Sequence, residues 1–188
     1  MIKIGITGSI ASGKSTASKI LSQTRGPLFS ADQAVKTLYN NNIFKQLLIS
    51  KFNMKEKRNF KVYLKRKILQ NISNIKKIEK IIHPLVRKEM KKFTAKNKNE
   101  KTLFYEIPLL IENKLMKYFD LIIFIKANKK NRLKRFKLKG GEEKLFNILD
   151  KKQMPTAKKI KFCDHVIIND KNLNVLKKNL LDIISVYA

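Results

Sequence analysis

The chain has 188 residues, which is enough for one full hydrophobic core and too few for two large independent domains. Its 43% apolar residues recur with clear periodicity, which argues against an intrinsically disordered chain. The formal net charge of +29 is carried mostly by lysine spread along the whole chain, whereas proteins that read nucleic-acid sequence rely on arginine. We therefore expect a solvated lysine surface that attracts anionic substrates, and no specific nucleic acid as a partner.

The sequence predicts neither a membrane span nor a secretion signal. No segment approaches ~20 apolar residues, the length that crosses a bilayer. The N-terminus leads directly into an apolar run at Ile2 and lacks the long apolar stretch of a signal peptide. The single cysteine, Cys163, excludes an internal disulfide and fits a reducing compartment. We expect a cytoplasmic protein with no membrane partner, and the sequence does not specify its oligomeric state.

Short apolar runs of strand length alternate with helical patterns along the chain. Runs that are apolar throughout are typical of strands buried on both faces of a parallel sheet. The final helix, about Leu173 to Val186, has one apolar face and should pack on that sheet. The fold class is therefore α/β, with about five parallel strands flanked by helices. The predicted strands are Ile2–Thr7, Pro27–Ser30, Thr102–Ile107, Leu121–Ile125 and His165–Ile168.

Two insertions interrupt this alternation. In the first, residues 33–99, apolar side chains step at three or four residues, which predicts a helical unit. Pro84 disfavours helix at His83, so we expect the chain to turn at this dipeptide and start a new helix. The second, residues 129–161, is basic, contains Gly140-Gly141 and predicts a mobile helical lid. The stepping residues are Leu64, Ile68, Ile72, Ile75, Ile78 and Ile82. We expect one domain over 1–188, with core segments 1–32, 100–128 and 162–188.

The segment Gly8–Ser15 reads Gly-Ser-Ile-Ala-Ser-Gly-Lys-Ser and fits the pattern G-x-x-x-x-G-K-[ST] between a predicted strand and a predicted helix. The two glycines let the backbone curl so that consecutive N–H groups and the positive helix end face a phosphate. Lys14 would reach the β and γ phosphates of ATP, and the Ser15 hydroxyl would ligate Mg²⁺. The alternative is a glycine-rich turn without a ligand. The predicted ATP-binding residues are Ala11, Ser12, Gly13, Lys14, Ser15 and Thr16.

A carboxylate, Asp32, follows directly on the second predicted strand. Ligands of parallel sheets lie at the carboxyl ends of the strands, so Asp32 is expected to face the transferring phosphoryl group. Phosphorylation of an alcohol requires loss of its proton, which an Asp can accept, or the Asp can hold a Mg²⁺-bound water. The alternative is an N-cap for a helix that begins near Gln33.

The order of further motifs resembles the dephospho-CoA kinase family over nearly the whole chain. That family has S-G-K-S-T in its phosphate turn, then D-A-D, a His-Pro after the helical insertion, P-L-L-x-E after the third strand, R-L-x-x-R in the lid, and Q-M-P with a basic residue before A-D. The corresponding segments here are Ser12–Thr16, Ser30–Asp32, His83-Pro84, Pro108–Glu112, Arg132–Arg135, Gln153–Pro155 with Lys159, and Cys163-Asp164, with Asn169 ending the fifth strand. Arg132–Arg135 has one residue fewer between its two arginines than R-L-x-x-R. Ser30 replaces the first acid of D-A-D, and Leu149 stands where the family often has Arg.

The resemblance implies a P-loop kinase fold and ATP-dependent phosphorylation of the ribose 3′-hydroxyl of dephospho-CoA, which gives CoA. It also implies roles for several residues. Asp32 and Lys14 would be catalytic together with Arg135, which would close with the lid over the phosphates. His83, Asp32 and Glu112 would contact the substrate, and Arg132 and Lys159 would belong to the lid. The alternatives are a core or capping role for His83, an ordering role for Glu112 in its own loop, and solvated lid arginines.

Two other functions stay open at this point. The phosphate turn alone does not choose the acceptor, so another small-molecule P-loop kinase, acting on a nucleoside, nucleotide or sugar, fits the same motif. The net charge motivates a different class, a basic nucleic-acid-binding ATPase with salt-sensitive affinity.

Overall fold

The computed structural model describes residues 1–53 and 73–187. The chain divides into two compact units: Met1–Ser30 with Lys96–Ala188, and Ala31–Ala95. The first contains the sheet and the phosphate loop, and the second is helical. Leu64, Ile68 and Ile72, which helped to predict the helical insertion, lie outside the described residues.

All five predicted strands are present in one parallel sheet, which confirms the predicted fold class. The strand order is β2-β3-β1-β4-β5. The central strand β1 pairs with β3 on one side, where Ile6 is opposite Glu106, and with β4 on the other, where Gly8 is opposite Ile125. The strands are β1 (Ile2–Gly8), β2 (Leu28–Ser30), β3 (Thr102–Glu106), β4 (Leu121–Lys126) and β5 (His165–Ile168).

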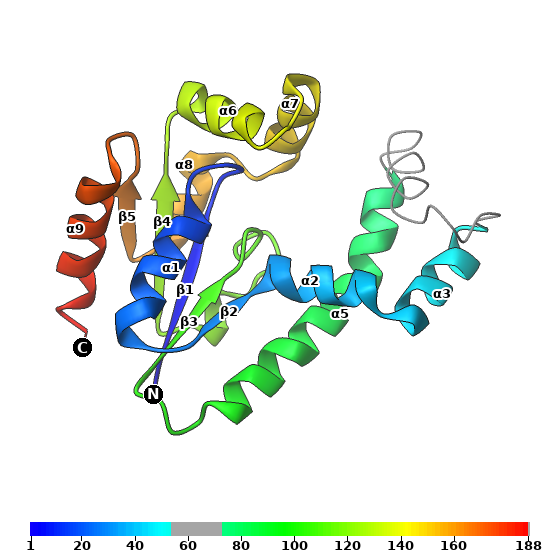
Figure 1. Ribbon diagram of the computed structural model, residues 1–188, viewed down its shortest axis with the longest axis horizontal. Helices are drawn as coiled ribbons and strands as arrows, with labels where there is room; N and C mark the ends of the chain where they lie inside the picture. The colour runs from blue at the N-terminus through cyan, green and yellow to red at the C-terminus, as the bar shows by residue number, and fades with distance from the viewer. Residues whose placement is uncertain (54–72, 188) are drawn as a thin grey trace. The chain divides into compact units, whose positions relative to one another are not determined.

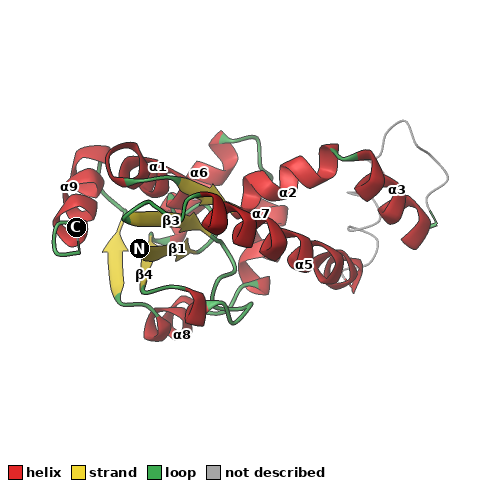
Figure 2. Ribbon diagram, turned by 90° about the horizontal axis from the view of Figure 1, so that it is seen from below, coloured by secondary structure: helices red, strands yellow, loops and turns green. Residues whose placement is uncertain are grey.

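Helices α1 (Lys14–Arg25) and α9 (Leu173–Ile184) cover one face of this sheet, and α8 (Thr156–Lys159) lies on the other side (Figures 1 and 2). The predicted apolar face of the last helix is confirmed for Leu176, Leu180 and Ile183, which pack with the strands. Leu173, which was expected on the same face, is 58% exposed. The shared cluster of helix and strand residues includes Ile4, Ile6, Leu21, Ile123, Ile167, Leu176 and Leu180.

The opposite face of the sheet is closed by the segment that follows β3. Gly5 of β1 lies under Leu110 and Phe119, and a Cβ at Gly5 would stand 2.7 Å from the Leu110 side chain. Tyr105 packs edge-on against Phe119, with ring centroids 5.3 Å apart. This segment also contains the short helix η1 (Met116–Tyr118). Burial on both faces explains why β4 is apolar from Leu121 to Ile125 without alternation.

The basic stretch that predicted a lid is helical. It contains α6 (Lys129–Leu138), α7 (Glu143–Lys152), α8 and η2 (Ile160–Phe162). Gly140 adopts φ 78° at the corner between α6 and α7, with no atom near the position of a Cβ. Phe136 and Phe146 pack together across this corner, with ring centroids 5.6 Å apart. Cys163 follows η2, and burial together with the Asp164 charge raises the pKa of its thiol to about 12.

The helical unit contains α2 (Ala31–Asn40), α3 (Asn42–Lys51) and most of α5 (Ser73–Lys96). Phe44, Leu48, Ile78 and Ile82 form its buried cluster. The prediction that the chain turns at His83-Pro84 is wrong, because α5 continues through Pro84. Proline removes one backbone hydrogen bond and crowds the preceding turn, which bends a helix without ending it when packing holds both halves. Figure 1 shows α5 changing direction along its length.

Asp170 ties the start of the lid to the loop after β5. Its Oδ1 accepts the Asn128 backbone N–H at 2.9 Å and the Asn131 side-chain amide at 3.1 Å. The Asn128 hydrogen bond is the main reason that the pKa of Asp170 lies below its ordinary value of 3.8, and the Asn131 amide and the Arg135 charge act in the same direction. The ionised carboxylate therefore stabilises the fold above the unfolded-state pKa, and this contribution disappears as the pH falls through the folded-state pKa.

We expect Asp170→Asn to lower the thermal unfolding midpoint slightly at pH 7, because the amide keeps the acceptor and loses the charge. The difference from the wild type should vanish in acid, where the wild-type carboxyl is protonated. Thermal melts of both proteins at neutral and acidic pH measure this. A difference of equal size at both pH values would contradict the assignment.

Across the described parts of the chain, no helix is long and apolar enough to cross a membrane.

Candidate active site

The phosphate loop joins the end of β1 to the start of α1 and needs glycine at both of its motif positions. Gly8 has φ 155°, and a Cβ there would collide with the carbonyl oxygen of Ile125. Gly13 has φ 100°, and a Cβ there would collide with the side-chain amide of Asn169. Any other residue would be strained and would clash at either position. The backbone conformation of the loop therefore requires the two glycines of the sequence pattern.

The first turn of α1 is open to a ligand and electrostatically suited to an anion. It carries no acidic residue, so its positive end is not neutralised by its own side chains. Ser15 and Thr16 are exposed at this end, whereas Lys14 is buried and its Nζ donates to the Ser9 carbonyl at 2.8 Å. Backbone N–H groups, a helix end and an ammonium group thus converge on one loop, an arrangement that binds phosphate.

A carboxylate that the sequence interpretation missed stands beside Ser15. Glu106 is the last residue of β3, only 4% exposed, and its Oε1 accepts the Ser15 hydroxyl at 2.5 Å. The signal was present in the sequence, because an acid at the carboxyl end of a strand next to the phosphate loop belongs to the ligand edge of such a sheet. Hydroxyl and carboxylate oxygens are the ligands that Mg²⁺ prefers, so this pair fits a magnesium ion.

Arg135 of α6 reaches the inner part of the phosphate loop. Its Nη1 donates to the Ser12 carbonyl at 3.3 Å, and its Nη2 donates to the Asn169 carbonyl at 2.8 Å. The Asn169 side chain donates to the same Ser12 carbonyl at 2.8 Å. Helix α6 and the residue that follows β5 therefore meet at Ser12 of the phosphate loop, and this contact brings a guanidinium to the loop.

Arg132, one turn earlier on the same helix, has a different environment. It is 7% exposed and forms an ion pair with Asp150 of α7, with Nη1 2.5 Å from Oδ1. Its guanidinium carbon lies 5.5 Å from the centre of the Phe146 ring, and its Nη1 lies 3.5 Å from the Ile10 carbonyl. The contacts with Asp150 and Phe146 join α6 to α7. The contact with the Ile10 carbonyl joins α6 to the phosphate loop.

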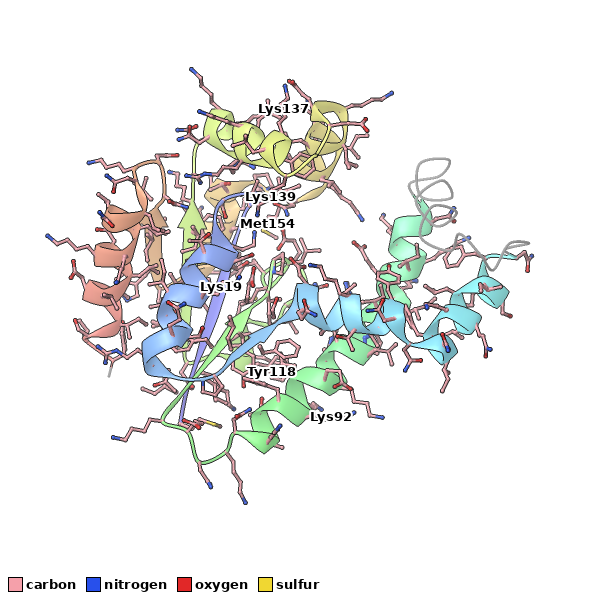
Figure 3. All side chains as sticks on the ribbon, viewed as in Figure 1. Lys19, Lys92, Tyr118, Lys137, Lys139 and Met154 are labelled. Carbon is pink, nitrogen blue, oxygen red and sulfur yellow. The ribbon has the colours of Figure 1, made fainter. Side chains whose placement is uncertain are left out.

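Glu112 and Lys159 form a buried ion pair. The Lys159 side chain is fully buried, and its Nζ lies 2.6 Å from Glu112 Oε1, at angles outside hydrogen-bonding geometry. The same oxygen accepts the backbone N–H of Met154 at 3.2 Å (Figure 3, where Met154 is labelled). The pair therefore connects the loop after β3 to the segment that returns from the lid.

Asp32 and His83 belong to the helical unit. Asp32 is exposed in the first turn of α2, where an acid suits the positive helix end, and α2 begins at Ala31, so Asp32 is not a cap before Gln33. Ser30, two residues before Asp32, pairs with Glu106 at the end of the sheet. His83 is half-buried in α5, immediately before Pro84.

The model of the dephospho-CoA kinase family matches residues 2–174. Among curated proteins, the dephospho-CoA kinase of Bartonella quintana is 34% identical over 96% of this chain and 95% of its own length. That of Fusobacterium nucleatum is 31% identical over 94% of both chains.

Solved structures agree with this match. The Thermus thermophilus protein TT1252 has a TM-score of 0.83 at 26% identity and covers 100% of this chain and 98% of its own. The dephospho-CoA kinase of Campylobacter jejuni has a TM-score of 0.69 at 26% identity, over 97% of this chain and 95% of its own. A shikimate kinase from Bacteroides thetaiotaomicron, at 12% identity and a TM-score of 0.56, shares the fold. A phosphate loop at the end of the central strand, a family match over residues 2–174 and curated relatives of 34% identity together place the chain in the dephospho-CoA kinase family.

Proposed function

We propose that this protein transfers the γ-phosphoryl group of ATP to the ribose 3′-hydroxyl of dephospho-CoA and releases CoA and ADP. The observation that carries the proposal is the phosphate loop, with Lys14 and an acid-free helix end, within a chain that matches the family from residue 2 to residue 174. The loop supplies the donor site, and the family match supplies the acceptor.

For ATP, the proposed contacts are the backbone N–H groups of Ala11 to Thr16, which face the α and β phosphates. Lys14 would leave the Ser9 carbonyl for the β and γ phosphates, since a phosphate oxygen is a stronger acceptor than a neutral carbonyl. Arg135 would offset the charge that spreads over the phosphoryl oxygens during transfer.

For Mg²⁺, the proposed protein ligand is Ser15, with Glu106 as a second ligand or as the acceptor of a bound water. Held there, the ion would supply positive charge that offsets the charge of the phosphates. Within the described segments no group of three or more His, Cys, Asp or Glu residues gathers. Magnesium in kinases commonly takes most of its ligands from phosphates and waters, so one hydroxyl and one carboxylate suffice.

At the acceptor, we propose that Asp32 receives the proton of the 3′-hydroxyl. The hydroxyl oxygen forms a bond to the γ-phosphorus as the bond to the β,γ-bridging oxygen breaks, and ADP leaves. We propose that His83 contacts dephospho-CoA from the helical unit. The contacts of Glu112 and Lys159 favour an ordering role for both.

The test of this proposal is an acceptor panel. The purified protein with ATP and Mg²⁺ should convert dephospho-CoA to CoA, and should act far more slowly on a nucleoside, a nucleotide or a sugar. The Lys14→Met variant serves as the inactive control. Equal turnover of another acceptor would favour the broader P-loop kinase assignment, and ATP hydrolysis that depends on added RNA or DNA would favour the nucleic-acid-dependent ATPase.

The proposed role of Arg135 predicts a split between turnover and binding. Arg135→Gln is expected to lower kcat about a hundredfold, because loss of one donor to a developing charge has effects of this order, and to weaken ATP binding much less. Arg25→Gln removes the same charge from the exposed far end of α1 and should leave both quantities unchanged. Steady-state kinetics measure kcat, and an ATP titration measures the affinity for ATP. Equal losses in kcat and ATP affinity would argue against a contact made mainly in the transition state.

A further inference from the structure

Two side chains from the returning segment, residues 153–159 after α7, contact the outer turn of the phosphate loop, Ser9-Ile10. Gln153 Oε1 accepts the backbone N–H of Ile10 at 3.0 Å. The Thr156 hydroxyl shares a hydrogen bond of 3.1 Å with the Ser9 hydroxyl. These contacts join residues more than 140 positions apart in the sequence. They hold Ser9 and Ile10, the first two residues of the loop after Gly8.

The segment that carries Gln153 and Thr156 is itself anchored from beneath. The Glu112 carboxylate accepts the Met154 N–H, next to Gln153, and pairs with Lys159, three residues after Thr156. Since the Lys159 side chain is fully buried, water screens this pair little, and its position is tightly restricted. The loop after β3 thus holds the returning segment at both of its ends.

The same outer turn, Ser9-Ile10, holds the Lys14 side chain. The Ser9 carbonyl accepts the Lys14 ammonium at 2.8 Å. A shift of Ser9 therefore moves the acceptor that orients the lysine of the phosphate loop. The chain of contacts runs from Glu112 and Lys159 through Gln153 and Thr156 to the turn that places Lys14.

We propose that Gln153 and Thr156, anchored by the Glu112–Lys159 pair, are positioning residues that keep the phosphate loop in its nucleotide-binding conformation. The inference rests on the proposed role of the loop in ATP binding. If the loop is already ordered before ATP binds, binding does not include the free-energy cost of ordering it. These residues should therefore affect ATP affinity and not the chemical step. They do not touch the substrate.

The test compares isosteric variants. Gln153→Met removes the acceptor and keeps the side-chain length, and Thr156→Val removes the hydroxyl while Thr156→Ser keeps it. Loss of one such hydrogen bond should raise the KM for ATP about fivefold, with little change in kcat or in the KM for dephospho-CoA. Thr156→Ser should restore the wild-type KM. Gln23→Met makes the same chemical change at an exposed position of α1 and should have no effect.

The anchor is tested by a double-mutant cycle with Glu112→Gln and Lys159→Met. Each single variant should raise the KM for ATP, and the double variant should raise it by less than the product of the two single effects. If one of these buried changes prevents folding, the Thr156 pair of variants decides the question, because Thr156 is only half-buried.

The outcomes separate this inference from the proposed function. If Lys14→Met lowers kcat/KM for ATP while Gln153→Met and Thr156→Val leave the KM for ATP unchanged, the positioning role is wrong and the phosphate site stands. If Lys14→Met keeps the wild-type kcat/KM for ATP, the phosphate site itself is wrong. A lower melting temperature with equal losses in kcat and in both KM values would indicate a general structural role and would overturn the inference.

Discussion

Replacing Lys14 by methionine is expected to lower kcat/KM for ATP at least about a hundredfold without unfolding the protein. The reason is electrostatic: the ammonium is the nearest cation that the loop can offer to the β and γ phosphates, and removal of one such group costs about 10²–10³ in rate. The methionine stem should still fill the buried space, where only 8% of the lysine is exposed. Steady-state kinetics with ATP and dephospho-CoA measure the loss, and thermal melts check the fold.

Lys19→Met is the matched control for this change. Lys19 lies five positions further along the same helix, is exposed, and is labelled in Figure 3. Its replacement removes the same charge from the same element and should leave kcat/KM unchanged. Equal losses in the two variants would mean that the overall positive charge attracts ATP and that Lys14 has no special place.

Asp32→Asn is the second change with a large expected effect. The amide keeps the size of the side chain and cannot accept the proton of the acceptor hydroxyl, so kcat should fall by a factor of about 10² to 10⁴. ATP affinity should stay close to that of the wild type, because the loop that binds the phosphates is untouched. Measured kcat values and an ATP titration separate the two effects.

Asp182→Asn, an equivalent change on the exposed side of α9, should have no effect on kcat. A kcat that Asp32→Asn leaves unchanged would remove Asp32 from the proposed chemistry and restrict it to the helix end.

The strands and the phosphate loop were predictable because their determinants are local. Each strand is marked by a short run rich in apolar residues, and all five runs were found. The loop path needs glycine at Gly8 and Gly13, so its pattern is visible in the sequence. The break at Pro84 was predicted wrongly because a local preference was overcome by packing of the helix around Ile78 and Ile82.

The rest of the candidate site depends on contacts between distant residues. Arg132 and Arg135 lie three residues apart and were both expected on one face of a helix, yet Arg132 pairs with Asp150 and Arg135 reaches Ser12. Nothing in their spacing separates the two, because the partner of each is set by the fold of α7 and β5. The bond between Gln153 and Ile10 likewise joins segments that only the folded chain brings together.

The corner at Gly140 offers a way to watch the lid in solution. Lys139, labelled in Figure 3, is exposed beside it, and no atom lies within 4 Å of the position of a Cβ at Gly140. A cysteine placed at Lys139 would react readily with a maleimide dye at neutral pH, whereas Cys163, with a pKa of about 12, stays protonated and reacts slowly. The native chain therefore already permits selective fluorescent labelling, without prior removal of its own thiol.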